Sequence, residues 1–200
     1  MIVDLEQNTQ EWLDYRGGIP TASQFHRLVT PAKVEPSKQI TDYAIQLAAE
    51  KWAGGPVDSW EGNEWTERGH ELEPEARMYY AMLRGEVEEV GFIVSDRFEA
   101  GCSPDGLIDE GLLEIKNLGA KAHVKALAQT ECPRDNMAQL QGQMLICERP
   151  WVDLLLYHPQ LPKRLIRVTP IEKFQTLLIE QIAKVCQERD RYYKIIEAAA

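Results

Sequence analysis

The sequence predicts an α/β fold in which a central mixed β-sheet is flanked by helices. Segments with strand-like patterns cluster in the middle and later part of the chain, and helical patterns come before, between and after them. The chain contains no internal repeat, no low-complexity stretch and no linker-like segment that would divide it. A single domain over residues 1–200 is therefore expected.

The composition is that of an ordinary soluble globular chain. Its 200 residues suffice for a sizeable core, and 44% of them are hydrophobic and 27% charged. The N-terminal segment lacks a basic region followed by an apolar run, and no stretch is long enough to span a membrane, so we expect a cytoplasmic protein. No CxxC spacing indicates a disulfide framework or a structural zinc site. The cysteines and histidines are scattered, at Cys102, Cys132, Cys147 and Cys186 and at His26, His70, His123 and His158.

The first elements are expected to be short. A helical turn over 11–15 ends at a glycine pair, and Thr21 can serve as the N-cap of a helix over 21–28. Amide groups at a helix start favour anions, and Arg16 and Ser23 lie close by in the sequence. These residues allow either an anion-binding site or an ordinary cap beside a surface arginine.

Two longer helices are expected next. Ser37 can cap a helix over 38–52, whose apolar residues recur at helical spacing. A second helical pattern runs over 65–83 and contains Pro74. Either that helix kinks at the proline or a new helix begins there.

A strand and two helices frame the middle of the chain. The strand is expected over 86–95, where apolar residues are frequent. After the hairpin described below, a short helix is expected over 120–128, with His123 facing solvent. Pro133 can open a longer helix over 133–147.

The C-terminal part is expected to hold two strands and a long helix. The strands span 151–157 and 164–168, and the amphipathic helix spans 171–196 with an apolar stripe that is either core or a subunit contact. The helix before these strands carries Gln139 and Gln143 one turn apart. A glutamine face on a helix is most often simply solvated.

The segment over 103–116 carries the polar groups around which the chain is organised. Apolar residues on both sides of a polar connection at 109–111 predict a β-hairpin, and alternation puts Glu114 and Lys116 on one face, away from the core. Asp105 lies on the first strand. It comes beside Glu114 only if the connection holds an even number of residues or a bulge corrects the register.

Two carboxylates and an amine in this arrangement indicate metal-assisted hydrolysis of a phosphodiester. Asp105 and Glu114 would repel each other unless a cation held them, and Mg²⁺ prefers few carboxylates together with carbonyl and water oxygens. Lys116 can orient or deprotonate the attacking water, or neutralise charge on the phosphorus. The competing interpretation is a surface hairpin on which Glu114 and Lys116 are solvated.

The net charge of −10 weighs against DNA binding, because affinity for phosphate comes from lysine and arginine. Local potential matters more than total charge, however, and carboxylates that bind metal are neutralised. An acidic exterior with a basic groove would reconcile the two. The basic residues available for such a groove are Lys116, Lys121 and Lys125, and Arg16, Arg27, Lys33 and Lys38.

Five ordered motifs carry a resemblance to a known family. The Pro-Asp pair at 104–105, followed by Glu-Ile-Lys at 114–116, is the PD-(D/E)xK signature. The strings RGGIPTAS, GHELEPEAR, CSPDG, LEIK and MAQLQGQM resemble the phage lambda exonuclease family, also called YqaJ-like viral recombinases. The match runs from about residue 11 to about residue 157. It implies a PD-(D/E)xK, restriction-endonuclease-like core and a phage or prophage alkaline exonuclease.

The resemblance also implies roles for individual residues. Arg16 and Ser23 match the family's residues that hold the 5′-phosphate, and Ser103 matches a third contributor. Glu73 matches a glutamate that approaches the metal, although the proline after it departs from the family. The implied catalytic residues are Asp105, Glu114, Lys116, Gln139 and Glu73, and the implied metal ligands are Asp105, Glu114, the main-chain carbonyl of Ile115, and Glu73.

The implied activity is that of a Mg²⁺-dependent 5′-3′ exonuclease. Such an enzyme degrades one strand of linear double-stranded DNA and leaves a 3′ single-stranded overhang for recombination. Two metal ions are expected, with Mn²⁺ able to substitute, together with a homotrimeric assembly and a single-strand annealing recombinase as partner in the bacterial host.

Two alternatives remain open. The first is an endonuclease of the same fold, either a restriction enzyme or a junction resolvase. The terminal-phosphate block at Arg16 and Ser23 argues against it, since an internal cut needs no such pocket. The second is a catalytically inactive DNA-binding scaffold, and the intact Asp105, Glu114 and Lys116 argue against that.

Overall fold

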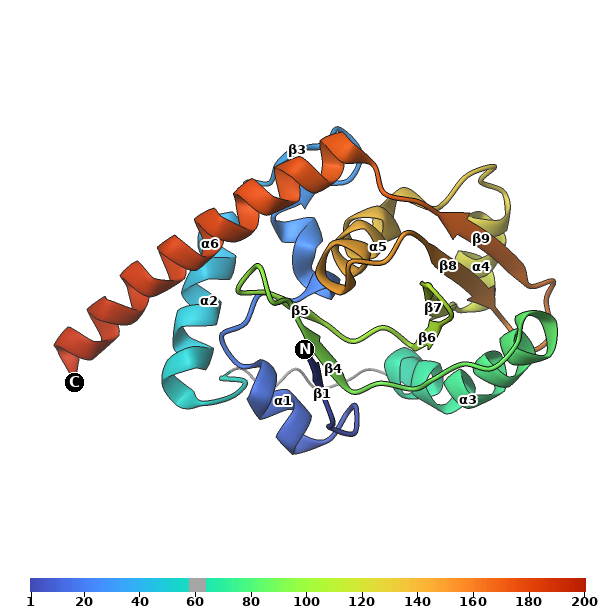
Figure 1. Ribbon diagram of the computed structural model, residues 1–200, viewed down its shortest axis with the longest axis horizontal. Helices are drawn as coiled ribbons and strands as arrows, with labels where there is room; N and C mark the ends of the chain where they lie inside the picture. Colours follow the sequence, from blue (N-terminus) through green and yellow to red (C-terminus); the bar gives the residue numbers. More distant parts are fainter. Residues whose placement is uncertain (58–63) are drawn as a thin grey trace.

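The computed structural model describes the backbone of residues 1–57 and 64–200 and the side chains of residues 1–57 and 71–200 (Figure 1). The helices are α1 (Gln10–Arg16), the 3₁₀ helix η1 (Ala22–Arg27), α2 (Ile40–Ala53), α3 (Glu64–Arg84), α4 (Ala120–Leu127), α5 (Arg134–Cys147) and α6 (Glu172–Ala199). The strands are β1 (Ile2–Val3), β2 (Val29–Thr30), β3 (Glu35–Pro36), β4 (Phe92–Val94), β5 (Gly101–Cys102), β6 (Gly106–Ile108), β7 (Gly111–Asn117), β8 (Val152–Tyr157) and β9 (Arg164–Val168).

The predicted mixed sheet flanked by helices is confirmed. Its strand order is β6-β7-β8-β9, with β7 parallel to β8 and the other neighbours antiparallel. A smaller antiparallel sheet, β1-β4-β5, leads into the first strand of the hairpin, and β2 pairs with β3. The chain between the parallel strands β7 and β8 contains α4 and α5, as a parallel connection requires.

Helices cover both faces of the central sheet. One face packs against α3 through a cluster that includes Ala76, Tyr80, Leu113, Ile115 and Leu155. The other face packs against α5 through the main core, which includes Leu112, Leu140, Met144, Leu154 and Leu156. Because side chains alternate along β7, the face that carries Glu114 and Lys116 is the one that faces α5. The prediction that this face lies away from the core is therefore wrong.

The register of the hairpin satisfies the parity condition. Ile108 pairs with Gly111 and Gly106 with Leu113, so the turn holds two residues rather than the three expected, and the number is even. The amide of Asp105 continues the pairing by donating to the carbonyl of Leu113 at 3.0 Å. Asp105 is thereby set opposite the residue that follows Leu113, and no bulge is needed.

Three expected elements differ in detail. The strand predicted over 86–95 is reduced to β4, because Glu88 instead exchanges two backbone hydrogen bonds with Leu107 at the edge of β6. The helix expected from Thr21 is a six-residue 3₁₀ helix, and Thr21 makes no side-chain capping bond. Its hydroxyl lies 3.3 Å from that of Ser23, and its backbone bridges to Gly101. Ser37 does not cap α2 either. Its hydroxyl accepts instead from the amide of Gln39, the residue at the N-cap.

The helix with an internal proline is continuous. Pro74 lies inside α3, so the alternative in which a new helix begins at the proline is wrong. A proline in a helix removes one backbone hydrogen bond but does not forbid continuation when the helix packs well. The buried Ala76 and Tyr80 that follow it hold α3 against the sheet.

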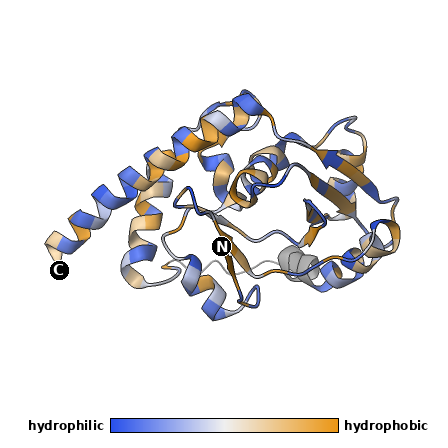
Figure 2. Ribbon diagram, in the orientation of Figure 1, coloured by the Kyte–Doolittle hydropathy of each residue, from blue (hydrophilic) through white to orange (hydrophobic). Residues whose placement is uncertain are grey.

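The C-terminal helix is a core element. Phe174, Leu178, Ile182 and Val185 of α6 are buried, and α6 runs alongside α2 before its last turns extend past the rest of the chain (Figure 1). Figure 2 shows hydrophobic and hydrophilic residues interleaved along α6, as expected for an amphipathic helix. Among the described residues, no helix combines the length and the apolar character needed to cross a bilayer.

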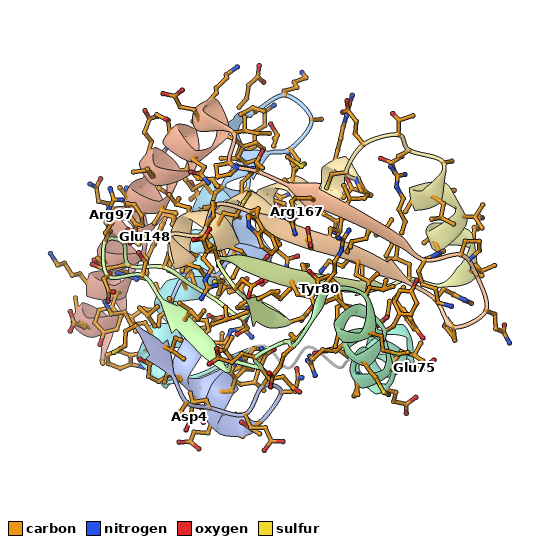
Figure 3. The ribbon with its side chains drawn as sticks, turned by 45° about the vertical axis from the view of Figure 1, so that its right-hand side comes forward. Asp4, Glu75, Tyr80, Arg97, Glu148 and Arg167 are labelled. Carbon is orange, nitrogen blue, oxygen red and sulfur yellow. The ribbon has the colours of Figure 1, made fainter. Side chains whose placement is uncertain are left out.

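A buried carboxylate joins α3, β8 and β9. Asp153 is 1% exposed and accepts hydrogen bonds from the Tyr80 hydroxyl at 2.7 Å and from Arg167 Nε and Nη2 at 2.8 and 2.9 Å. The Arg167 guanidinium also stacks over Trp151 at 3.6 Å. Figure 3 shows Tyr80 on α3 and Arg167 on β9, and far from them the surface pair of Arg97 and Glu148.

We predict that Arg167→Met destabilises the protein by about 1–3 kcal/mol, because Asp153 would stay buried while losing two charge-assisted hydrogen bonds. Arg97→Met is the matched control. The ion pair of Arg97 with Glu148 is 3.4 Å long and exposed on both sides, so its loss should change stability by less than about 0.5 kcal/mol. Chemical denaturation of both variants measures the difference, and equal effects would contradict the role of Asp153.

Candidate active site

A single pocket of about 640 Å³ gathers side chains that lie far apart in the sequence. Its walls come from the helices α1, η1, α3 and α5, from β5 and the segment that leads to Asp105, and from β7 of the hairpin. Of the residues that the sequence singled out, those lining it are Arg16, Ser23, Glu73, Ser103, Asp105, Lys116 and Gln139. Glu114 lies beneath them, in contact with Lys116 and Gln139.

Asp105 is held at the edge of the hairpin. Its Oδ2 accepts the Ile115 amide at 2.5 Å, which fixes the carboxylate against β7. Burial, together with the negative charges of Glu114 and Glu73, raises the pKa of Asp105 well above its usual range. In the protein alone, these carboxylates are therefore crowded together with too little positive charge to balance them.

Glu114 is almost fully buried, at 3% exposure, and both of its oxygens are engaged. Oε1 accepts from Lys116 Nζ at 2.6 Å and from Gln139 Nε2 at 2.7 Å, and Oε2 accepts from Gln143 Nε2 at 2.6 Å. The competing interpretation, a solvated surface glutamate, is excluded by this burial. Two glutamines from α5 thus satisfy a carboxylate on the central strand.

Lys116 joins the carboxylate to the helix. Its ammonium donates to Glu114 Oε1 and, at 3.1 Å, to Gln139 Oε1. Burial by itself would lower the pKa of Lys116, but the charges of Glu114 and Asp105 outweigh it and raise that pKa. Lys116 is therefore a charged hydrogen-bond donor in this arrangement, suited to orienting a group and balancing charge.

Glu73 lies on α3, and the expected pair with Arg77 is present. Arg77 Nη2 donates to Glu73 Oε1 at 2.6 Å, but the two side chains are only 15% and 22% exposed, so the pair is not the exposed one expected. Arg77 also donates through Nε to the main-chain carbonyl of Asp105 at 3.0 Å and pairs with Glu89 at 2.7 Å. This arginine ties α3 to the hairpin.

The carboxylate oxygens of Asp105 and Glu114 are suitable ligands for a hard divalent cation. Asp105 and Glu114 provide carboxylates whose mutual repulsion a cation would relieve, and Mg²⁺ is usually bound by one or two carboxylates plus water. Within the part of the chain that the structure describes, no three His, Cys, Asp or Glu side chains form a cluster able to hold a metal ion. Metal ligation by Asp105, Glu114, Glu73 and the carbonyl of Ile115 stays a prediction.

The pocket also carries a half-buried cation, Arg16. The Arg16 guanidinium lies 3.7 Å from the centre of the Trp12 ring, and burial lowers its pKa to about 10. Its Nε is buried and has no hydrogen-bond partner among the described residues. A desolvated guanidinium with an unpaired donor is costly, and an anionic ligand would lower that cost.

Two serines lie near this arginine. Ser23 is exposed on η1, with its hydroxyl 3.3 Å from that of Thr21. Ser103 is half-buried and accepts from the Trp12 indole at 3.1 Å. The anion site expected from a helix start loses its helix-dipole argument, because η1 is a short 3₁₀ helix. The three side chains Arg16, Ser23 and Ser103 nevertheless line one pocket.

Some residues around the site were missed or misjudged. The sequence assigns no role to Gln143, although its spacing of one turn from Gln139 puts both amides on one face of α5 and is the signal for a shared contact. His123 is fully buried rather than solvent-facing, since its Nε2 lies 2.8 Å from the Pro162 carbonyl where α4 packs on the sheet. Lys121 and Lys125, on the same helix, are exposed. Cys102 is 2% exposed and packs in the main core, where burial raises the pKa of its thiol well above the ordinary value.

Comparison with known proteins gives consistent results. Residues 11–150 match the YqaJ-like viral recombinase domain. The alkaline exonuclease LHK-Exo from Laribacter hongkongensis is 27% identical, with a TM-score of 0.84 over 96% of this chain and 97% of that one. A second structure of LHK-Exo, in complex with dAMP, is 28% identical, with a TM-score of 0.78 over 96% and 100% of the two chains.

A phage-related exonuclease from Haemophilus somnus 129PT shares the fold at 16% identity. Its TM-score is 0.62, over 91% of this chain and 96% of that one. Curated proteins give no match.

We predict that Asp105→Asn stabilises the protein in a chelating buffer at pH 7. Because its pKa is raised in the folded protein, Asp105 costs folding free energy at any pH above its ordinary pKa. The cost is full above the raised pKa, shrinks as the pH falls from there and disappears below the ordinary pKa. Asparagine removes the charge but can still accept from the Ile115 amide. The melting temperature should rise by about 2 °C or more, since roughly 2–4 °C corresponds to 1 kcal/mol in a chain of this size.

The control is Glu110→Gln, which removes one charge from the exposed turn of the same hairpin and should leave the melting temperature nearly unchanged. Added Mn²⁺ should stabilise the wild type but not the Asp105→Asn protein. A lower melting temperature for Asp105→Asn in chelator would show that the carboxylates are not in conflict.

Proposed function

The chain belongs to the YqaJ-like viral recombinase family, and on this basis we propose that it is a Mg²⁺-dependent exonuclease acting on linear double-stranded DNA. It removes nucleotides from the 5′-ended strand and leaves a 3′ single-stranded overhang. The similarity to alkaline exonucleases supports the nuclease class. The direction and the choice of duplex DNA rest on the family resemblance and on the arrangement of charge in the pocket.

One observation carries the proposal: a single pocket that holds crowded carboxylates and an arginine whose Nε is buried and unpaired. A cation at the carboxylates would engage the scissile phosphate, while Arg16 with Ser23 and Ser103 would engage the terminal phosphate of the same strand. An endonuclease cuts within a strand and needs no contact with a terminal phosphate.

Asp105 and Glu114 are the proposed ligands of the cation, with the Ile115 carbonyl and Glu73 as further contributors. A bound Mg²⁺, or Mn²⁺ in its place, would polarise the phosphate and favour hydroxide over water at the attacking position. The expectation of two ions rests on the family resemblance.

The remaining residues hold and orient the reacting groups. Lys116, as an ammonium 2.6 Å from Glu114, can balance the charge that develops on the phosphate oxygens. Gln139 contacts both Lys116 and Glu114, so its amide can fix the direction in which the ammonium points. Neither residue needs to exchange a proton to play these parts.

The size of the pocket agrees with removal of single nucleotides. Its 640 Å³ falls within the roughly 300–1,000 Å³ typical of small-molecule sites. The LHK-Exo structure with dAMP contains a deoxynucleoside monophosphate, which is the product class expected of such an exonuclease. We propose the same product class here.

We further propose a homotrimer that works with a single-strand annealing recombinase in the cytoplasm of a bacterial host. The family resemblance supports both the trimeric assembly and the annealing partner. The exposed face of α3, where Met78 is 62% and Met82 82% exposed, offers an apolar surface for a subunit contact.

The proposed function is tested by comparing linear 5′-phosphorylated duplex with closed circular duplex in Mg²⁺. We predict release of mononucleotides from the linear substrate and no cutting of the circle. Lys116→Met should lower the rate at least about a hundredfold, because the charge near the phosphate is lost. Nicking of the circle by the wild type, or a Lys116→Met rate equal to that of the wild type, would contradict the proposal.

We also predict that Arg16→Ala lowers the preference for 5′-phosphate over 5′-hydroxyl ends roughly tenfold to a hundredfold, the worth of one charge-assisted hydrogen bond. Arg97→Ala is the control. Arg97 is exposed and pairs with Glu148 outside the pocket, so removing it changes the charge by the same amount without touching the terminal phosphate. Initial rates on the two kinds of end give the preference, and similar losses in both variants would refute a specific pocket at Arg16.

A further inference from the structure

A second glutamine, Gln143, contacts Glu114 besides Gln139. Gln143 is 1% exposed and its Nε2 donates to Glu114 Oε2 at 2.6 Å. The other donors to this carboxylate, Lys116 and Gln139, both reach Oε1. Gln143 thus contacts Oε2, the carboxylate oxygen that Lys116 and Gln139 do not contact. Together the three donors fix the plane of the carboxylate.

We propose that Gln143 is a positioning residue of the active site, which sets the orientation of Glu114 for cation binding. This inference rests on the proposed function. The terminal torsion of a glutamate is broad and shallow, so a buried carboxylate without a contact on each oxygen can rotate. With Oε2 held by one N–H, a carboxylate keeps acceptor capacity on that oxygen for a cation.

The amide of Gln143 has one possible orientation. Turning it over would bring its oxygen against Glu114 Oε2, and two acceptors at hydrogen-bond distance repel. In the observed orientation, Oε1 of Gln143 is buried without a partner among the described residues. The protein tolerates an unpaired amide oxygen at the edge of the pocket in order to keep the N–H on Glu114.

A structural glutamine on the same helix behaves differently. Gln141 is fully buried, and both ends of its amide are paired: Nε2 donates to the Thr169 carbonyl at 2.9 Å and Oε1 accepts from the Ile171 amide at 2.8 Å. These contacts join α5 to the start of α6 and lie outside the pocket. Gln141 is thus satisfied at both ends of its amide, whereas Gln143 is satisfied only toward Glu114.

The test compares Gln143→Leu and Gln143→Asn with Gln141→Leu. Leucine has nearly the shape of glutamine without the amide, and asparagine keeps the amide but is one methylene too short to reach Glu114. Three quantities are measured on each full-length protein: the melting temperature, the affinity for Mn²⁺ without DNA by calorimetry, and the turnover on linear duplex at saturating Mg²⁺.

Both Gln143 variants should weaken Mn²⁺ binding or turnover about tenfold to a hundredfold, the usual cost of losing a group that orients a metal ligand. Gln143→Leu should lower the melting temperature no more than Gln141→Leu does, because the hydrogen bond lost from Glu114 is partly offset by removal of an unpaired buried oxygen. Gln141→Leu should lower the melting temperature while leaving Mn²⁺ affinity and turnover within about twofold of the wild type, since it lies outside the pocket.

Wild-type Mn²⁺ affinity and turnover in both Gln143 variants would overturn the proposal, as would an equal loss in Gln141→Leu. Failure of the proposed function would look different. The wild type itself would then neither bind Mn²⁺ nor degrade DNA, and the role of Gln143 would fall with it.

Discussion

The site depends on a carboxylate buried on the central strand. Removing Glu114 from water is unfavourable unless hydrogen-bond donors replace the solvent, and the chain supplies three of them, one from β7 itself and two from α5. This requirement places α5 across the face of the sheet that carries Glu114. It also brings Lys116 against the carboxylate and opens the space between α5, η1 and the hairpin in which the pocket lies.

The pocket holds charges of both signs while the chain as a whole is acidic. Asp105 and Arg16 line it and Glu114 lies beneath, so under the proposed function a DNA strand would meet a cation and a guanidinium in one pocket. A net charge of −10 then matters less than the local field, because the acidic groups nearest the substrate are the ones that a metal would neutralise.

Two of the buried unpaired groups of the described residues lie at the site, and others, His123 Nδ1 and Gln181 Oε1, lie outside it. Arg16 Nε and Gln143 Oε1 lack partners among the described residues, and Asp105 faces uncompensated negative charge. By contrast, the buried Asp153 accepts three hydrogen bonds, and the buried Arg189 donates to Glu99, Asp190 and the Gly18 carbonyl. A scaffold that satisfies its own buried charges can carry a few that are left for metal and phosphate, at some expense in stability.

The sequence by itself determined the sheet class, the extent of most helices and the register condition that sets Asp105 opposite Glu114, because alternation and turn length act over a few residues. Its ordered motifs also named the residues that line the pocket. Only the tertiary structure decided that the face bearing Glu114 is buried, that Gln143 joins Gln139 on it and that His123 is packed inside. Those outcomes depend on which helix covers which face of β7 and β8. That choice is made by contacts between segments tens of residues apart, on which the local pattern has no influence.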